Sequence, residues 1–328
     1  MRGRQRRRRD RVAFLLALAL IAVAGGTTAY AAVNRHAPIS FTLDRATAPA
    51  AKTVEHLDFS GYWLATHGQP NLPIHGQAAY LVDADAGQVL WQRDPETPRA
   101  PASLTKLITA MVAVDDARGS LDRTVTVPAA ATEVMPSVMG LSAGEKLTVR
   151  ELLDGLFLDS GNDAAEALAG GIVPRAMFIR QMNGKAKYIG LTESHFVNPS
   201  GLDADGHLMS AHDLVRAAAY LDARYPQLAA IGGTKDVAIP ATATHKAFYP
   251  HNVNLLLSRY PGATGLKTGL TDNAGGCTLG TATRGARHLI VVVLNATGHS
   301  TDDAITLLDY GFSVHPGAAL GPFSTTPH

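Results

Sequence analysis

Three short motifs in this chain carry side chains that together could perform acyl transfer. In chain order they are SLTK at residues 103–106, SGN at 160–162 and KTG at 267–269. They supply a serine nucleophile, an amine to activate it, a second hydroxyl, an amide and a second cation, which fits a reaction through a covalent serine ester. Each motif alone is common, since an SxxK arises about once by chance in a chain of this length. Their combination and order therefore indicate a site.

The first motif pairs a hydroxyl with an amine. Ser103 and Lys106 are three residues apart and share one face of a helix. If Ser103 lies in the first turn, the positive end of the helix dipole favours a developing alkoxide. Burial beside Leu107 and Met111 would lower the pKa of Lys106 until the neutral amine accepts the serine proton. Taken alone, the pair is also explained by a helix-capping serine and a solvated lysine.

The other two motifs bring polar groups to a turn and a strand. Ser160 and Asn162 fall between two predicted helices, where they can project into a cleft, although ordinary turn chemistry also selects such residues. Lys267 and Thr268 lie in a glycine-rich segment typical of an edge strand beside a ligand, and they could hold a carboxylate. A lysine that guards an edge strand against aggregation is the alternative.

Apolar patterning predicts the elements that must position these motifs. Two strands at 78–83 and 88–92 form a hairpin, and strands return at 277–282 and 288–294. Helices are predicted at about 103–118, 148–168, 176–189, 210–221 and 302–310. Strands at both ends and helices between them predict an α/β (α+β) fold, with an antiparallel sheet flanked by helices and a helical subdomain.

The first 33 residues are typical of export. Seven arginines and Asp10 lie within the first eleven residues, and residues 12–33 carry no charge. An AYA sequence at 29–31 offers a cleavage site, so we expect a signal peptide or an N-terminal membrane anchor, and an extracytoplasmic body. Without this leader the 29 basic and 28 acidic residues become 22 and 27, a balance of −5. That mildly acidic body argues against a nucleic-acid partner.

The rest of the chain divides into three parts. We expect a linker or stalk at 34–74, a globular domain at 75–315 and a tail at 316–328, with the apolar stretch 57–64 lying on the domain surface. Cys277 is the single cysteine and sits in a predicted buried strand, which favours a structural thiol. No HExxH occurs, and DADG at 203–206 lacks the distal glutamate of a calcium loop, so we expect neither metal nor cofactor.

The residues around the motifs resemble one family closely. The stretches are RAPASLTKLIT at 99–109, LDGLFLDSGNDA at 153–164, FVNPSGL at 196–202 and YPGATGLKTG at 260–269. They are similar to the D-alanyl-D-alanine carboxypeptidases, low-molecular-mass penicillin-binding proteins of serine peptidase family S11, whose motif set is SxxK, SDN and KTG. SGN stands here in place of SDN. The resemblance spans about residues 78–312 and implies a β-lactamase/transpeptidase-like fold.

The resemblance also implies a role for each site residue. Ser103 would attack the carbonyl between the two terminal D-alanines of a peptidoglycan stem peptide, with Lys106 as general base, and β-lactams would be covalent inhibitors. Ser160 would relay a proton to the leaving amine, and Asn162 would bind the amide of the acyl group. Lys267, Thr268 and Gly269 belong to the motif that would hold the terminal carboxylate. The N–H groups of Ser103 and Leu270 would form the oxyanion hole.

Two details leave alternatives open. Where relatives often have a basic residue, residues 251–256 read HNVNLL, so carboxylate binding would depend more on Lys267. A β-lactamase would need a deacylating glutamate between the second and third motifs, whereas TESHFVN at 192–198 reads like the carboxypeptidases. A D,D-endopeptidase would use the same site, and a non-catalytic penicillin or muropeptide sensor is the reading from a different class.

Overall fold

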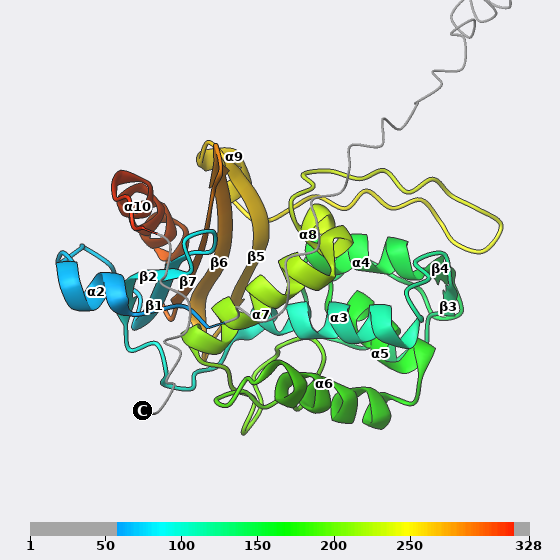
Figure 1. Cartoon of the computed structure of the whole chain (residues 1–328). Coiled ribbons are helices and arrows are strands. Elements are labelled where there is room, and N and C mark those ends of the chain that lie inside the picture. The colour runs from blue at the N-terminus through cyan, green and yellow to red at the C-terminus, as the bar shows by residue number, and fades with distance from the viewer. Residues whose placement is uncertain (1–57, 318–328) are drawn as a thin grey trace, which may run out of the picture. The chain divides into compact units, whose positions relative to one another are not determined.

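The computed structural model describes residues 58–317, and a five-stranded sheet organises that body (Figure 1). The strands are β1 (Ala78–Asp83), β2 (Gln88–Arg93), β5 (Ala263–Thr271), β6 (Gly275–Arg284) and β7 (Arg287–Leu294). Their order is β2-β1-β7-β6-β5, and every neighbouring pair is antiparallel. Ala78 of β1 lies opposite Leu294 of β7, so strands from the two ends of the body are paired, as the sequence predicted.

Helices fill the long interval between β2 and β5. They are α3 (Lys106–Asp116), α4 (Val149–Phe157), α5 (Asn162–Ile172), α6 (Arg175–Ile189), α7 (Ala211–Arg224), α8 (Pro226–Gly232) and the short α9 (Leu256–Arg259). Two 3-10 turns, η1 (Ala102–Thr105) and η2 (Ala129–Thr132), and a two-stranded sheet of β3 (Thr124–Thr126) and β4 (Lys146–Thr148) complete this part. The capping box of Thr148 and Glu151 starts α4, and the Ser210 hydroxyl caps α7.

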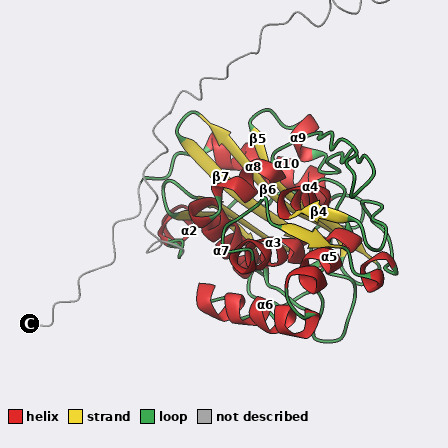
Figure 2. Cartoon of the chain, turned by 90° about the vertical axis from the view of Figure 1, so that its right-hand side faces the viewer, coloured by secondary structure: helices red, strands yellow, loops and turns green. Residues whose placement is uncertain are grey.

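The sheet is buried on both faces. Figures 1 and 2 show α10 (Ser300–Ser313) on one face and α7 and α8 on the other. Alternate residues of β7 serve the two sides: Val291 and Val293 pack in the cluster that contains Leu307, whereas Val292 joins the helical core. This two-sided burial explains why β7 reads as a continuous apolar run.

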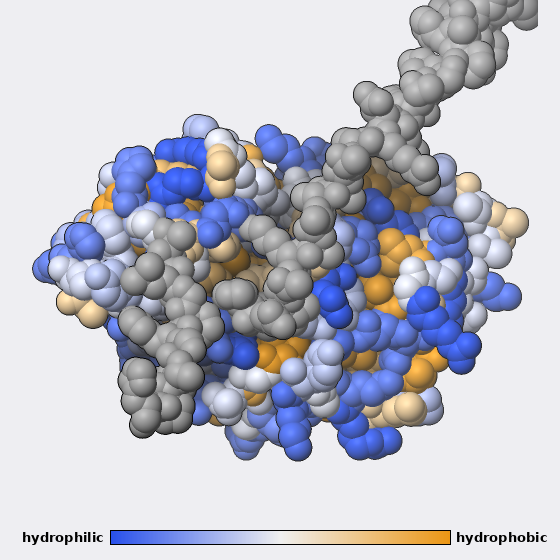
Figure 3. All heavy atoms as spheres, in the orientation of Figure 1, coloured by the Kyte–Doolittle hydropathy of each residue, from blue (hydrophilic) through white to orange (hydrophobic). Residues whose placement is uncertain are grey.

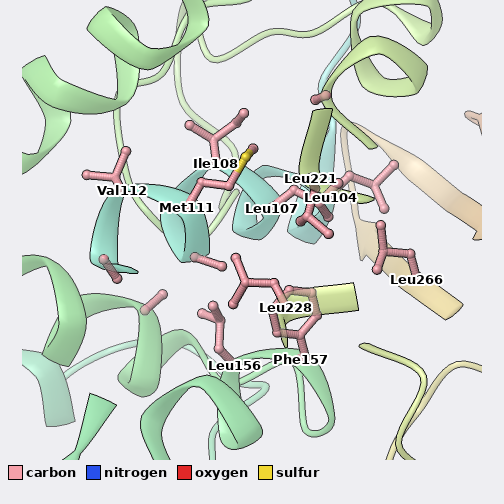
Figure 4. Close-up of a cluster of buried hydrophobic side chains, with 14 of the residues drawn as sticks. Leu104, Leu107, Ile108, Met111, Val112, Leu156, Phe157, Leu221, Leu228 and Leu266 are labelled. Carbon is pink, nitrogen blue, oxygen red and sulfur yellow. The ribbon is translucent and has the colours of Figure 1, made fainter. Parts of the chain in front are cut away.

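The helical core positions the segment that carries the first motif. Figure 4 shows apolar side chains from η1, α3, α4, α7, α8 and β5 in contact around Leu107 and Met111, both fully buried. Close packing of this kind leaves little freedom for the backbone of α3. The face drawn in Figure 3 is mainly hydrophilic, with smaller apolar areas between the polar residues.

The predicted stalk contributes its last part to the folded body. Residues 58–74 include α2 (Tyr62–His67), which contacts β2, and the Trp63 N–H donates to Gln88 Oε1 at 3.2 Å. Ile74 is buried. The leader at 1–33, the stalk residues 34–57 and the tail from 318 lie outside the described residues. Within 58–317, no helix has the length and apolar character needed to cross a membrane.

Candidate active site

The three motifs meet at one open cavity of about 590 Å³. Six predicted site residues line it directly: Ser103, Ser160, Asn162, Thr268, Gly269 and Leu270. The other lining residues come from the loops, helices and strands around them: Pro136, Ser137, Gly201, Leu202, Val253, Leu255, Arg259, Thr271, Gly276, Cys277, Gly298, Ser300, Thr301 and Asp302. The remaining two predicted residues, Lys106 and Lys267, are buried beside the cavity with 0% and 1% exposure. The sequence motifs therefore converge from the helical part and from the edge of the sheet.

Ser103 lies on a 3-10 turn and not in the first turn of the α-helix. The turn η1 precedes α3, which begins at Lys106, so the prediction of an α-helix from residue 103 was wrong at its first turn. Ala102 has a φ of 49°, a left-handed conformation that an α-helix does not contain. Two glycines permit this tight turn: a Cβ on Gly201 would lie 1.8 Å from the Ala102 carbonyl oxygen, and one on Gly269 would lie 2.7 Å from the Ser103 nitrogen.

The Lys106 amine has three oxygen neighbours. Its Nζ lies 2.8 Å from Ser103 Oγ, 2.7 Å from Asn162 Oδ1 and 2.8 Å from the Ser200 carbonyl oxygen. The orientation of the Asn162 amide is fixed because its Nδ2 donates to the Met135 carbonyl at 2.7 Å. Neither Asn162 Oδ1 nor the Ser200 carbonyl has a proton to give. In a neutral amine, two N–H bonds serve these acceptors and the lone pair faces the Ser103 hydroxyl.

The surroundings of Lys106 favour that neutral form. Complete burial, and second the charge of Lys267, hold its pKa well below the usual range, while Asp163 opposes the shift. None of its three hydrogen-bond partners is a carboxylate. A lysine that is neutral at working pH and in contact with a serine hydroxyl is equipped to act as a general base.

The second motif stands at the start of α5, as the sequence predicted. Ser160 has a φ of 58°, a conformation that non-glycine residues adopt rarely. The next residue, Gly161, is the N-cap of α5, and Asn162 begins the helix. Ser160 and Asn162 thus present a hydroxyl and an amide to the same cavity as Ser103.

Asp163, directly after this motif, holds the loop that follows the cavity residues 136–137. Its buried carboxylate accepts the backbone N–H groups of Met139, Gly140 and Leu141 at 2.8 to 2.9 Å. The Asn162 N–H donates to the Ser137 carbonyl at 2.7 Å and ties the same loop to α5. Sequence reasoning did not single out Asp163, because the loop that it binds is more than twenty residues earlier in the chain.

Replacing Asp163 by alanine should lower the free energy of unfolding by about 2–4 kcal/mol, because three backbone N–H groups lose a buried, charged acceptor. Urea denaturation of this variant measures the loss of stability, and Glu166→Ala on the same helix is the control. Glu166 forms an ion pair with the half-exposed Arg175. Its replacement should therefore lower the free energy of unfolding by less than about 1 kcal/mol. Equal losses in the two variants would contradict this role of Asp163.

The third motif lies on the edge strand β5, as predicted, but its lysine is placed differently from the expectation. Thr268, Gly269 and Leu270 line the cavity, whereas Lys267 is buried and its Nζ donates to the Thr268 carbonyl at 3.0 Å. Burial lowers the pKa of Lys267 to about 7. The alternative of a solvent-exposed guard lysine is excluded by this burial. The ammonium instead lies close enough to Lys106 to lower its pKa.

Known proteins resemble this chain in sequence and in fold. Residues 65–298 match the family model of the Peptidase S11 D-alanyl-D-alanine carboxypeptidases. This chain belongs to that family. It is 37% identical to the carboxypeptidase DacB2 of Mycobacterium tuberculosis over 79% of this chain and 91% of the relative. It is 34% identical to the longer DacF of Bacillus subtilis, over 75% of this chain and 65% of the relative. Penicillin-binding protein D2 of Listeria monocytogenes, solved in a cefotaxime-bound form, superposes with a TM-score of 0.67 at 30% identity, over 74% of this chain and all of that one.

Two further cavity residues of this S11 protein were not found from its sequence. Arg259 of α9 and Asp302 of α10 line the cavity and form an ion pair at 2.5 Å. They are the charged residues among those that line it. Arg259 stands between the predicted site segments without a motif of its own, and only the packing of α9 beside β5 brings it to the cavity.

The single cysteine is buried in a strand, as the sequence predicted. Cys277 of β6 is fully buried in the cavity wall, and burial raises the pKa of its thiol to about 11, which favours the protonated form. Among residues 58–317, no group of three or more His, Cys, Asp or Glu side chains has the arrangement of a metal site.

Proposed function

We propose that this S11 family member is a serine-type D-Ala-D-Ala carboxypeptidase that removes the terminal D-alanine from peptidoglycan stem peptides through an acyl-enzyme on Ser103. One observation carries the proposal. The buried Lys106 Nζ lies 2.8 Å from Ser103 Oγ, and its other two partners are acceptors only. A neutral amine in this position can take the serine proton during attack, which is the step that a serine ester mechanism requires.

The proposed reaction has two steps. The Ser103 oxygen attacks the carbonyl between the two D-alanines while its proton passes to Lys106, and the N–H groups of Ser103 and Leu270 stabilise the oxyanion. The C–N bond breaks and the ester forms as Lys106 returns its proton through Ser160 to the leaving nitrogen, so D-alanine leaves as the amine and Lys106 is neutral again. Water then attacks the ester, gives a proton to Lys106, and the shortened peptide leaves as Ser103 regains its hydroxyl proton.

The cavity suggests how the substrate would be held. Asn162 of α5 and Thr268 of β5 both line it. We propose that Asn162 binds the amide of the acyl group and that Thr268 binds the terminal carboxylate. Arg259 supplies a cation in the same cavity, where a substrate carboxylate can compete with Asp302. Lys267 is too deeply buried to carry carboxylate binding alone. Its main effect in this proposal is on the protonation of Lys106.

Lys267→Met should move the acid limb of the pH profile for penicillin acylation to higher pH. Removing the positive charge raises the pKa of Lys106, so its neutral form is lost sooner as pH falls. Folding stability provides a second readout. Because the folded pKa of Lys267 is about 7 and the unfolded one about 10.5, stability rises with pH between these values, and the variant should lose that contribution. Lys187→Met on the exposed face of α6 should change neither quantity. An unmoved acid limb in Lys267→Met would refute this role.

Two partner and location assignments extend the proposal. We propose that β-lactams acylate Ser103, which is supported by family membership and by the cefotaxime-bound form of the Listeria relative. We also propose that the body works outside the cytoplasmic membrane, on the basis of the arginine-rich and apolar leader.

The deciding experiment is incubation of the purified protein with a pentapeptide that ends in D-Ala-D-Ala, scored for free D-alanine, alongside labelling with fluorescent penicillin. We expect both D-alanine release and covalent labelling. Labelling without release of D-alanine would favour an endopeptidase or a sensor. Cleavage of cross-linked peptide dimers would identify the endopeptidase, whereas a sensor would cleave neither the pentapeptide nor the dimers. Rapid turnover of the β-lactam would favour a β-lactamase. Absence of both signals would refute acyl transfer at this site.

A further inference from the structure

A chain of hydrogen bonds connects a buried histidine to the peptide group just before the nucleophile. The Val197 N–H donates to His207 Nδ1 at 3.1 Å, and His207 Nε2 lies 2.8 Å from Thr105 Oγ1. Thr105 Oγ1 in turn donates to the Ala102 carbonyl at 2.9 Å. Thr105 and His207 are 0% and 2% exposed, so water does not compete for these bonds.

The direction of every proton in this chain follows from its ends. The Val197 N–H can only donate, so Nδ1 of His207 holds a lone pair and the single proton of the neutral ring is on Nε2. Thr105 Oγ1 accepts a hydrogen bond from this Nε2–H and donates its own O–H to the Ala102 carbonyl, which can only accept. Burial, and second the charge of His195, lower the pKa of His207 to about 4, which keeps the ring in this neutral form.

The end of the chain is the peptide unit that carries an oxyanion donor. The Ala102 carbonyl and the Ser103 N–H belong to one planar group, so a bond that fixes the carbonyl also fixes the direction of the N–H. A hydrogen bond accepted by the carbonyl further polarises the amide and strengthens the N–H as a donor. Ala102 has a φ of 49°, a conformation that persists only when its surroundings impose it.

We propose that Thr105 and His207 are positioning residues that orient and polarise the Ala102–Ser103 peptide for oxyanion stabilisation during acylation of Ser103. This inference rests on the proposed acyl transfer at Ser103. It assigns a function to a threonine inside the first motif and to a histidine that belongs to none of the three motifs.

Thr105→Val tests the inference, because valine keeps the branched shape and removes the hydroxyl. We expect the acylation rate constant with benzylpenicillin and kcat for D-alanine release to fall roughly tenfold, less than the 10²–10³ typical when a donor is removed. KM should change little. The carbonyl stretch of the penicilloyl ester should move to higher frequency, because its oxygen is bound less strongly. His207→Phe, which keeps a ring without nitrogens, should do the same.

Rates are expressed per active site titrated with fluorescent penicillin, so a loss of folded protein does not imitate the effect. Thr109→Val is the matched control, since Thr109 is one turn further along α3 and its buried hydroxyl donates to the Pro199 carbonyl at 2.6 Å. The Thr109→Val variant should be less stable but keep the wild-type acylation rate and ester frequency. Thr105→Ser, which retains a hydroxyl, should have the rate and the frequency that Thr105→Val loses. Equal rates and frequencies in Thr105→Val and Thr109→Val would overturn this inference alone. A wild-type protein that is never acylated would overturn the proposed function together with it.

Discussion

Ser103→Ala should abolish covalent labelling by fluorescent penicillin and lower D-alanine release by at least about 10⁴-fold, because no ester can form without the hydroxyl. The fold should persist, since Ser103 is only partly buried and its Oγ serves mainly the Lys106 amine. Gel fluorescence at saturating penicillin gives the first result, and a D-alanine assay gives the second. Circular dichroism and a melting curve show that the variant is folded.

Substitutions of two of the other cavity serines make this result specific. Ser137→Ala removes a hydroxyl from the cavity wall outside the three motifs and should label like the wild type. Ser160→Ala should still label, but more slowly, because Ser160 helps to move a proton and forms no ester. Mass spectrometry of the labelled wild type should find the adduct on the tryptic peptide that contains residue 103. Persistent labelling of Ser103→Ala would place the nucleophile elsewhere in the cavity.

Much of the architecture could be predicted from local sequence signals. The alternating and continuous apolar runs at 78–92 and 277–294 predicted strands that are β1, β2, β6 and β7, and the glycine-rich KTG segment is the edge strand β5. The turn before α5 was recognised because serine, glycine and asparagine are typical of turns and caps. Each of these signals depends on residues that are close together in the chain.

The unpredicted features depend on contacts between distant segments. The buried position of Lys267 follows from the packing of β5 against the helical body, where an edge-strand pattern predicts a lysine in contact with solvent or ligand. The 3-10 turn at Ser103 follows from close approach of Gly201 and Gly269, which are about 100 and 166 residues further along. The links from Asp163 to residues 139–141 and from His207 to Thr105 are similarly non-local.

Lys106→Met should reduce the acylation rate of Ser103 by about 10³–10⁴-fold, the upper part of the range for loss of a general base. Methionine has a similar length and no basic nitrogen, so Ser103 keeps its position and loses its proton acceptor. Lys106→Arg is the informative companion variant. A guanidinium keeps the positive charge but cannot be deprotonated in a protein, so it should be equally inactive if Lys106 acts as a base. Substantial activity in Lys106→Arg would show that the charge, and not the lone pair, is what Ser103 requires.

The pH dependence separates these two roles further. Because burial and the charge of Lys267 hold the pKa of Lys106 well below its usual range, the wild type should keep its acylation rate as pH falls until that lowered pKa is reached. Both Lys106 variants should lack this acid limb in their residual rates. The substitution Lys106→Met should affect stability and activity in opposite directions. Between the lowered pKa of Lys106 in the folded protein and about 10.5, the amine is protonated in the unfolded chain and neutral in the folded protein, so its burial lowers the free energy of unfolding. Lys106→Met should recover part of this loss. The gain is reduced because the variant loses the Lys106 hydrogen bonds to Asn162 and Ser200. A burial that disfavours the charged lysine is thus the same property that makes it a base, and a stopped-flow pH series on the wild type and both variants tests the two together.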